Sequence, residues 1–162
     1  LLVINRLKLN YQERALTLAA VPQNPDFTLN ETSARAVIER IHGFVDHPRV
    51  ELVVGDFFTG ALPPADLYAL GRILHDWNES RIKQLLAKVK AALTPGGALL
   101  IAEKLLTPSN VSAHMQSLNM LVCAEGRERT LDEYRALLQD AGFHSVEGVV
   151  TGTPLDAVLA IA

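Results

Sequence analysis

This sequence contains a single cysteine, and it contains no glycine before residue 43. Cys123 is the only cysteine in 162 residues, so an internal disulfide is excluded and a reducing compartment, the cytoplasm, is expected. A single cysteine also leaves no Cys/His cluster with the spacing of a metal site, and we expect no metal. The first glycine is Gly43, so a long opening segment lacks the residue that most readily adopts a positive φ.

Other absences narrow the class of protein. The net charge of −3 at pH 7 gives no basic footprint, so nucleic acid is not an expected partner. No apolar run is long enough to span a bilayer and no signal-peptide pattern is visible, so no membrane partner is expected. A hydrophobic content of 49% and a charged content of 20% are typical of a soluble globular protein. We find no repeat or linker, and we expect residues 1–162 to form a single domain.

Apolar runs alternate with amphipathic segments along the chain. Buried strands are expected at residues 1–4, 50–54, 67–74, 98–102, 146–150 and 155–161. Helices are expected at residues 11–20, 32–44, 78–93, 112–123 and 130–141, the last with a capping box from Thr130 to Glu133. Strands that alternate with helices predict an α/β fold with a mostly parallel sheet, and residues 151–154 predict a closing hairpin.

The first chemical signal lies where the strand at residues 67–74 ends. His75, Asp76 and Trp77 follow the apolar run, and a helix comes next. Ligands of open α/β sheets bind at the carboxyl ends of the strands, and histidine is the side chain best suited to take a proton near neutral pH. These residues predict a catalytic base, with a histidine that only closes the strand as the alternative. In an extended chain Asp76 points away from His75, so we assign it a supporting role.

Short blocks with a fixed order and spacing extend over residues 50–160. They are Gly55-Asp56-Phe57-Phe58, Leu62-Pro63, Asp66-Leu67-Tyr68, Arg72-Ile73-Leu74-His75-Asp76-Trp77, Pro95-Gly96-Gly97, Glu103, Ser117-Leu118-Asn119-Met120-Leu121-Val122, Glu125-Gly126-Arg127-Glu128-Arg129-Thr130 and Ala141-Gly142-Phe143. With these blocks the chain resembles the small-molecule O-methyltransferases that use S-adenosylmethionine, in particular the acetylserotonin (hydroxyindole) O-methyltransferase-like group. The resemblance implies a class I methyltransferase (Rossmann-like) fold, with helices on both faces of the sheet and a reversed last strand.

The resemblance also implies a reaction. A methyl group would pass from S-adenosylmethionine, leaving S-adenosylhomocysteine, to a hydroxyl of a small aromatic molecule without a metal. His75 matches the family's general base, and Glu103 and Glu128 match the two glutamates that orient and stabilise it. From the residues alone, Glu103 also fits a solvated strand end, and Glu128 also fits a charge at the entry of a helix.

Four further positions match the family's cofactor residues. The resemblance implies that Asp56 accepts a hydrogen bond from the cofactor and that Phe57 packs against its adenine. Arg72 matches a residue near the cofactor, and Trp77 is expected to form a wall of the same pocket. From the residues alone, Asp56 also fits an ordinary turn after a strand, and Trp77 also fits the core.

The acceptor pocket is expected on the helix at residues 112–123. Met115 and Asn119 lie four apart and therefore share one helix face, so Asn119 is expected to bind a polar group of the substrate. Family members also carry an upstream helical domain that dimerises and closes this pocket. The chain begins with Leu1 rather than Met and has no room for that domain, so we expect an excerpt or a processed product, and a homodimer in the full-length protein.

Residues 1–45 depart from the family pattern. The family has a glycine-rich turn after its first strand, whereas residues 2–9 contain no glycine, and Leu7, Lys8 and Leu9 resist positive φ. Thr28 stands where the family's second strand ends in an acid that binds the ribose, and a hydroxyl is a weaker acceptor than a carboxylate. The alternative function is therefore a non-catalytic module that has lost cofactor binding and acts in protein interaction or regulation.

Overall fold

The structure, a computed structural model, describes residues 2–5, 15–20, 50–54 and 56–162, with side chains from Asp56 onward. Its strands are β1 (Leu2–Asn5), β2 (Ala15–Ala20), β3 (Val50–Val54), β4 (Ala65–Gly71), β5 (Leu93–Glu103), β6 (His144–Val149) and β7 (Asp156–Ile161). Its helices are the 3-10 turn η1 (Leu74–Asp76), α3 (Glu79–Ala92), α4 (Val111–Cys123) and α5 (Leu131–Asp140).

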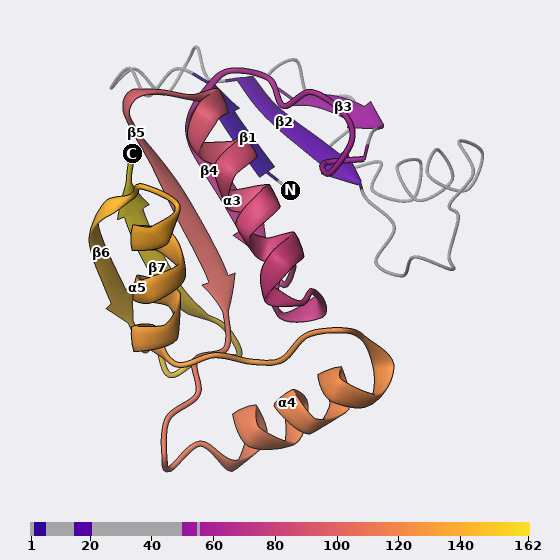
Figure 1. Ribbon diagram of the computed structural model, residues 1–162, viewed down its shortest axis with the longest axis vertical. Helices are drawn as coiled ribbons and strands as arrows, with labels where there is room; N and C mark the ends of the chain where they lie inside the picture. The colour runs from indigo at the N-terminus through magenta and orange to yellow at the C-terminus, as the bar shows by residue number, and fades with distance from the viewer. Residues whose placement is uncertain (1, 6–14, 21–49, 55) are drawn as a thin grey trace.

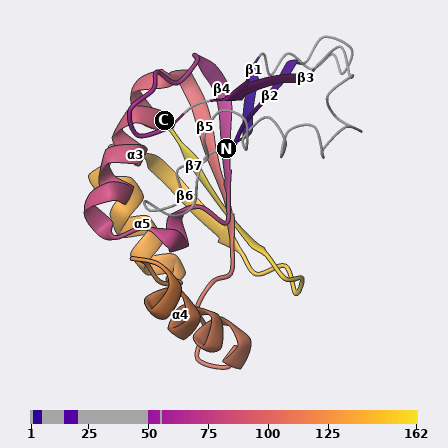
Figure 2. The same cartoon turned by 90° about the vertical axis from the view of Figure 1, so that its right-hand side faces the viewer.

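The described strands form one seven-stranded sheet in the order β3-β2-β1-β4-β5-β7-β6. Strands β4 and β5 are parallel, and β7 runs antiparallel to both β5 and β6, which confirms the expected reversed last strand and closing hairpin. Helices α3 and α5 lie on the same face of the sheet (Figures 1 and 2). The helix predicted at residues 32–44 lies outside the described residues.

Strand β1 runs opposite to the direction that a mostly parallel sheet predicts. It is antiparallel to β2, where Leu2 pairs with Leu18, and antiparallel to β4, where Leu2 pairs with Ala69. Only residues 6–14 separate β1 from β2, and a parallel connection needs roughly a dozen or more residues. The carboxyl end of β1, at Asn5, therefore lies at the end of the sheet opposite to the carboxyl end of β4.

Strand β2 replaces part of the helix that we predicted at residues 11–20, and that prediction was wrong for residues 15–20. Leucine and alanine favour helices, but this segment pairs with β1 on one side and with β3 on the other. Strand pairing outweighs helix propensity here, and Leu16 and Leu18 alternate with Thr17 as a strand requires. Thr28, which we placed at the end of the second strand, lies outside the described residues.

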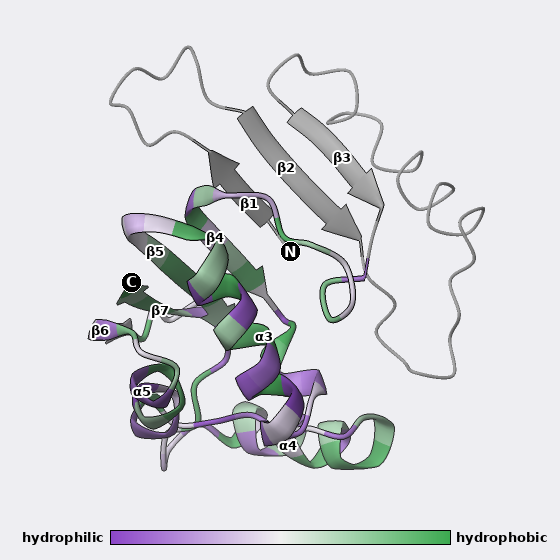
Figure 3. Ribbon diagram, turned by 45° about the horizontal axis from the view of Figure 1, so that its top comes forward, coloured by the Kyte–Doolittle hydropathy of each residue, from purple (hydrophilic) through white to green (hydrophobic). Residues whose placement is uncertain are grey.

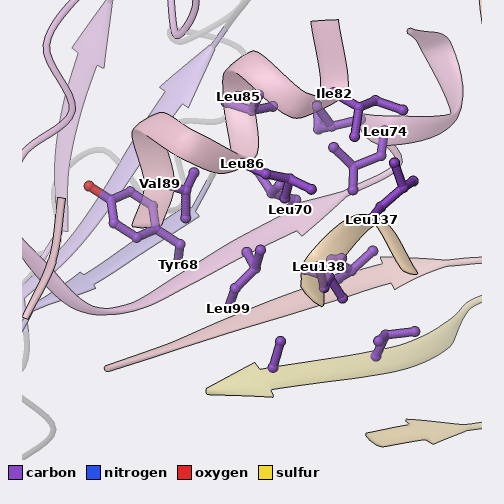
Figure 4. Close-up of a cluster of buried hydrophobic side chains, with 14 of the residues drawn as sticks. Tyr68, Leu70, Leu74, Ile82, Leu85, Leu86, Val89, Leu99, Leu137 and Leu138 are labelled. Carbon is purple, nitrogen blue, oxygen red and sulfur yellow. The ribbon is translucent and has the colours of Figure 1, made fainter. Parts of the chain in front are cut away.

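Local capping explains why α3 and α5 begin as predicted. The side chain of Asn78 accepts a hydrogen bond from the backbone N–H of Arg81, 3.1 Å away, and this bond caps α3. Thr130 and Glu133 form the predicted capping box of α5. The buried stripe of α3 then packs on β4 and β5, and Figure 4 shows it against the sheet with side chains of α5 beside it.

Helix α4 stands apart from this core. It lies beyond the carboxyl end of β5 (Figure 1), and Ala113 and Met120 are its buried residues. Its large apolar side chains are mostly exposed, and α4 carries much of the hydrophobic colouring at that end of the molecule in Figure 3. They are Val111, Met115, Leu118, Leu121 and Val122. Among the described residues, no helix combines the length and apolarity that crossing a bilayer requires.

Candidate active site

The turn η1 carries His75 away from the carboxyl end of β4. Arg72 has a positive φ of 52° and donates its backbone N–H to the carbonyl of Ala102 on β5, 3.1 Å away. The chain then closes the 3-10 turn instead of continuing as an extended strand. For this reason Asp76 does not point away from His75 as we expected. Its Oδ1 lies 3.5 Å from Nε2 of His75, on the same side of the turn.

The imidazole of His75 is held by Glu128. The His75 side chain is 3% exposed, and its Nδ1 lies 2.8 Å from Oε1 of the fully buried Glu128. Because an ionised carboxylate only accepts hydrogen bonds, Nδ1 carries the hydrogen, and Nε2 of the neutral ring keeps its lone pair. The second oxygen of Glu128, Oε2, has no hydrogen-bond partner within the described part of the chain. The ring thus has a fixed tautomer and a free basic nitrogen.

Glu103 contacts the backbone of the turn. Its Oε1 accepts the N–H groups of Ile73, Leu74 and His75 at 3.0, 2.5 and 3.3 Å, and its Oε2 accepts the hydroxyl of Tyr134. One ligand atom each of His75, Glu103 and Glu128 lie within 4.8 Å of one another, close enough to surround an ion. Both oxygens of Glu103 are already engaged, and Nδ1 of His75 is engaged with Glu128. The donor set therefore suits proton handling better than metal binding.

These contacts shift the proton affinity of the site. Burial by itself lowers the pKa of His75, but the Glu128 hydrogen bond and the charges of Glu103, Glu128 and Asp76 outweigh it. The pKa of His75 therefore lies above its ordinary value of 6.5. Burial raises the pKa of Glu103, and the charge of His75 and the hydrogen bonds from Tyr134 and Leu74 partly offset that rise.

The loop at residues 125–130 comes very close to η1. The backbone N–H of Glu125 donates to the carbonyl of Asp76 at 3.2 Å, and Asn78 donates to the Glu125 carboxylate at 2.7 Å. A Cβ at Gly126 would lie 2.2 Å from the carbonyl oxygen of His75, so only glycine fits. This approach brings Glu128 to His75 across 53 residues of sequence.

The predicted cofactor residues differ in burial and do not form one compact cluster as His75, Glu103 and Glu128 do. Asp56 is exposed, and its carboxylate accepts the N–H of Phe58 and the hydroxyl of Thr59 within its own turn. Phe57 is buried in the core, whereas Phe58 meets Trp77 edge-on with ring centroids 4.9 Å apart. These contacts bring residues 56–58 and Trp77 together. The side chain of Arg72 is exposed.

The predicted acceptor residues lie on the exposed side of α4. Met115 is 61% exposed, and Asn119 is also exposed and accepts a weak hydrogen bond from Sγ of Cys123, 3.6 Å away. Helix α4 touches η1, so this surface lies near the turn that carries His75. No contact between either side chain and His75 is present among the described residues.

A family model described as the O-methyltransferase domain matches residues 17–144. The chain belongs to this family. The match begins within β2, so the reversed strand β1 lies outside it. The order of the sheet and its reversed last strand agree with the class I methyltransferase fold of the family's solved members.

Among curated relatives of this chain, the acetylserotonin O-methyltransferase of Bos taurus is 50% identical over 115 residues, which covers 69% of this chain and 33% of that protein. A Homo sapiens protein, the probable bifunctional dTTP/UTP pyrophosphatase/methyltransferase, is 48% identical over 115 residues, which covers 69% of this chain and 18% of that protein. The chain thus spans a third or less of the length of these relatives.

Solved structures of O-methyltransferases share the fold. The structure of human N-acetylserotonin methyltransferase in complex with SAM matches with a TM-score of 0.76 and 35% identity, covering 90% of this chain and 39% of that chain. An O-methyltransferase family 2 protein from Planctomyces limnophilus in complex with apigenin matches with a TM-score of 0.75 and 26% identity, covering 90% and 42%.

Two buried polar residues of this O-methyltransferase domain were not predicted from the sequence as site residues. Arg129 and Tyr134 are completely or almost completely buried, and both bond to the machinery that holds His75. Arg129 closes a run of alternating charges that looks solvated, and Tyr134 lies among apolar residues of an amphipathic helix. The one available signal was the position of Arg129 directly before a capping box, which fixes where the chain turns into α5.

Proposed function

We propose that the protein transfers a methyl group from S-adenosylmethionine to a hydroxyl of a small aromatic molecule, with His75 as the general base. The buried pair of His75 and Glu128 carries this proposal, because in the neutral ring it places the hydrogen on Nδ1 and leaves Nε2 to accept a proton. S-adenosylmethionine, when bound, supplies a methyl group on a sulfonium centre with a good leaving group. The protein must then align the acceptor and take its proton.

The residues around His75 explain how a proton can be held there. An acceptor hydroxyl that hydrogen-bonds to Nε2 gives up its proton to that nitrogen, and the ring becomes an imidazolium. Glu128 at Nδ1 and Asp76 near Nε2 stabilise the positive charge. Because the ring is almost completely buried, bulk water competes little for the basic nitrogen.

The residues that would hold the cofactor fit it only in part. Each Asp56 oxygen makes one bond within the turn, so the carboxylate keeps lone pairs for a further hydrogen bond. Phe58 is half-buried, whereas Phe57 and Trp77 are buried in the core, and the Arg81 guanidinium lies over the Phe58 and Trp77 rings. Arg72 offers an exposed cation. The carboxyl end of β1 lies at the far end of the sheet, where it cannot supply a backbone turn to the same molecule. We therefore expect the cofactor to bind, but weakly.

We also propose the class of the methyl acceptor and the oligomeric state of the whole protein. The relatives' names support N-acetylserotonin and related hydroxylated aromatic molecules as trial acceptors. Met115 and Asn119 would contact the acceptor from α4, whose exposed apolar side chains suit an aromatic ring. A homodimer and a cytoplasmic location remain predictions for the whole protein.

Replacement of His75 tests the proposed base. We expect His75→Gln to lower the turnover of radiolabelled methyl transfer by on the order of 10²–10⁴-fold, because a glutamine cannot take the proton. The affinity for S-adenosylhomocysteine, measured by calorimetry, should change less than about twofold, because the ring supplies proton transfer rather than cofactor binding. The matched control is His144→Gln, at an exposed position on β6. Full turnover in the His75 variant would remove this residue from its role.

Calorimetric titration with S-adenosylhomocysteine tests the cofactor residues separately. We expect Asp56→Ala to weaken binding by about tenfold, since one charge-assisted hydrogen bond contributes roughly 1.5–3 kcal/mol or less in exposed sites. Asp132→Ala is the control, because Asp132 is an exposed acid on α5 whose partner is Arg135. Equal affinities of the two variants would show that Asp56 does not bind the cofactor, and no binding by the unchanged protein would contradict the proposed function.

A further inference from the structure

We infer that Arg129 and Tyr134 are positioning residues, which hold η1 from opposite sides and so fix the imidazole of His75 for proton transfer. This inference rests on the proposed role of His75 as the base. The hydrogen bonds of these two side chains go to the backbone of the turn and to Glu103 rather than to the ring.

The turn η1 is unstable by itself and needs an external support. It is three residues long, and no side chain caps it from the N-cap position at Ile73. A single 3-10 turn has poor hydrogen-bond geometry and a costly nucleus. The N–H groups of Ile73, Leu74 and His75 instead all point to one oxygen of Glu103. The position of His75 therefore depends on where that carboxylate is held.

Tyr134 holds the second oxygen of Glu103. Its hydroxyl is buried and donates to Oε2, so the carboxylate is fixed at both oxygens. Burial and the charge of Glu103 raise the pKa of Tyr134 well above 10.0, so the hydroxyl keeps its proton and remains a donor. Tyr134 lies in the first turn of α5, which the capping box of Thr130 and Glu133 anchors. The support thus extends from α5 through Glu103 to the N–H groups of the turn.

Arg129 holds the carbonyl side of the same turn. One guanidinium nitrogen donates to the carbonyl of Leu74 at 3.2 Å, and another donates to the carbonyl of Trp77 at 3.3 Å. These carbonyls lie on either side of His75 in the sequence. The planar, rigid fork of arginine can bridge two such acceptors at once. The nitrogen that donates to Leu74 also donates to the carbonyl of Arg127 at 3.0 Å. Within the part of the chain that the structure describes, Arg129 forms no ion pair with a carboxylate, so its bonds join the backbone of its own loop to the backbone of the turn.

The neighbouring residue connects this support to the ring. Glu128, which bonds to Nδ1 of His75, directly precedes Arg129, so one segment holds both the ring and the backbone that carries it. That segment is fixed in turn, because the N–H of Leu106 donates to the carbonyl of Arg129 at 2.9 Å. A movement of Arg129 would therefore change the alignment of the ring and the carboxylate together.

Removal of the Tyr134 hydroxyl gives the sharpest test. NMR titration of isotope-labelled histidine follows the His75 ring without substrate or cofactor, and His75→Gln assigns its signals. In Tyr134→Phe we expect the midpoint of the His75 titration to fall, because Glu103 loses the donor that favours its charged form. The control is Tyr68→Phe, since Tyr68 is equally buried but its hydroxyl donates to the carbonyl of Pro63. Identical titrations of His75 in both variants would overturn the inference.

Kinetics of the Arg129→Lys variant provide the second test. Lysine keeps the charge but lacks the fork, so we expect kcat to fall by on the order of tenfold to 10²-fold, with KM for N-acetylserotonin changed less than about twofold. Arg135→Lys, at a surface position on α5, should leave both constants unchanged. An unchanged kcat per folded molecule in Arg129→Lys would contradict a positioning role.

The two tests separate this inference from the proposed function. If His75→Gln keeps full turnover, the proposed base is wrong, while the NMR titration still decides whether Tyr134 acts on the His75 ring. If Arg129→Lys fails to fold, the Tyr134→Phe titration decides alone, because that substitution removes one oxygen atom and preserves the ring.

Discussion

His75 is buried, yet its pKa is raised. Neighbouring carboxylates must therefore stabilise the positive charge of its protonated ring. Burial favours the neutral ring, whereas Glu128, Glu103 and Asp76 favour the charged ring, and the carboxylates prevail. The folded-state pKa therefore exceeds the value of 6.5 expected in the unfolded chain. Such a group stabilises the fold most below pH 6.5, and this stabilisation is lost as the pH rises through the folded-state pKa.

The pH dependence of catalysis should report this shift. If the neutral ring acts as the proposed base, kcat/KM should rise with pH to a plateau, with a midpoint above 6.5. Glu128→Gln should lower that midpoint, since a neutral amide no longer stabilises the imidazolium. The same sign applies to stability: urea unfolding should show a larger deficit for His75→Gln at acid pH than at alkaline pH. A midpoint that does not respond to Glu128→Gln would contradict the assigned hydrogen bond.

At the scale of elements, the candidate site forms where two segments come into direct backbone contact. The 3-10 turn η1 and the loop at residues 125–130 meet at Gly126, which has no space for a Cβ. This close approach is the reason that Glu128 reaches His75 at 2.8 Å. Helices α3 and α5, which follow these two segments in the sequence, lie on the same face of the sheet (Figure 2).

Substitution of Gly126 should therefore separate the two segments. We expect Gly126→Ala to lower the free energy of unfolding by about 1–3 kcal/mol, as overpacking against backbone typically does, and to reduce turnover with it. Gly71→Ala is the matched control, because a Cβ at Gly71 meets no atom within 4 Å and the change should stay within about 0.5 kcal/mol. Chemical denaturation of both variants measures the difference, and equal stabilities would contradict the close approach.

Elements whose ends depend on local chemistry could be predicted from the sequence. Helices α3 and α5 begin directly after Asn78 and Thr130, whose side chains cap the backbone three residues later. Strand β2 could not be predicted in this way, because its alanines and leucines favour a helix and only its pairing with β1 and β3 makes it a strand.

At the scale of the whole molecule, the order of the strands agrees with the family but the direction of β1 does not. The family match begins after β1. This strand lies in the sheet between β2 and β4 but outside the matched region. Its reversal moves its carboxyl end away from the end of the sheet where His75 lies. The residues proposed to handle the proton, His75, Glu103 and Glu128, lie together, whereas the carboxyl end of β1 lies at the other end of the sheet.

Disulfide trapping can test the direction of β1. In a Cys123→Ser background, the pairs Leu2→Cys with Ala69→Cys and Ile4→Cys with Leu67→Cys should both cross-link on oxidation. Directly paired residues on antiparallel strands have Cβ atoms roughly 4.5–5.5 Å apart, which approaches disulfide range. The control, Ile4→Cys with Gly71→Cys, should not cross-link. If β1 were parallel to β4 with Leu2 opposite Ala69, the Ile4–Gly71 pair would cross-link and the Ile4–Leu67 pair would not.

The sequence by itself determined the candidate catalytic groups, a histidine after a strand and two glutamates. It also determined the helices whose caps lie within four residues of the groups they satisfy. Tertiary structure decided which group each glutamate meets, with Glu128 bonded to the His75 ring and Glu103 bonded to the backbone of its turn. It also decided that Asp76 lies beside His75 and that β1 is reversed. Local patterns carry no information on these points, because each depends on contacts between residues distant in sequence or on a turn that such contacts stabilise.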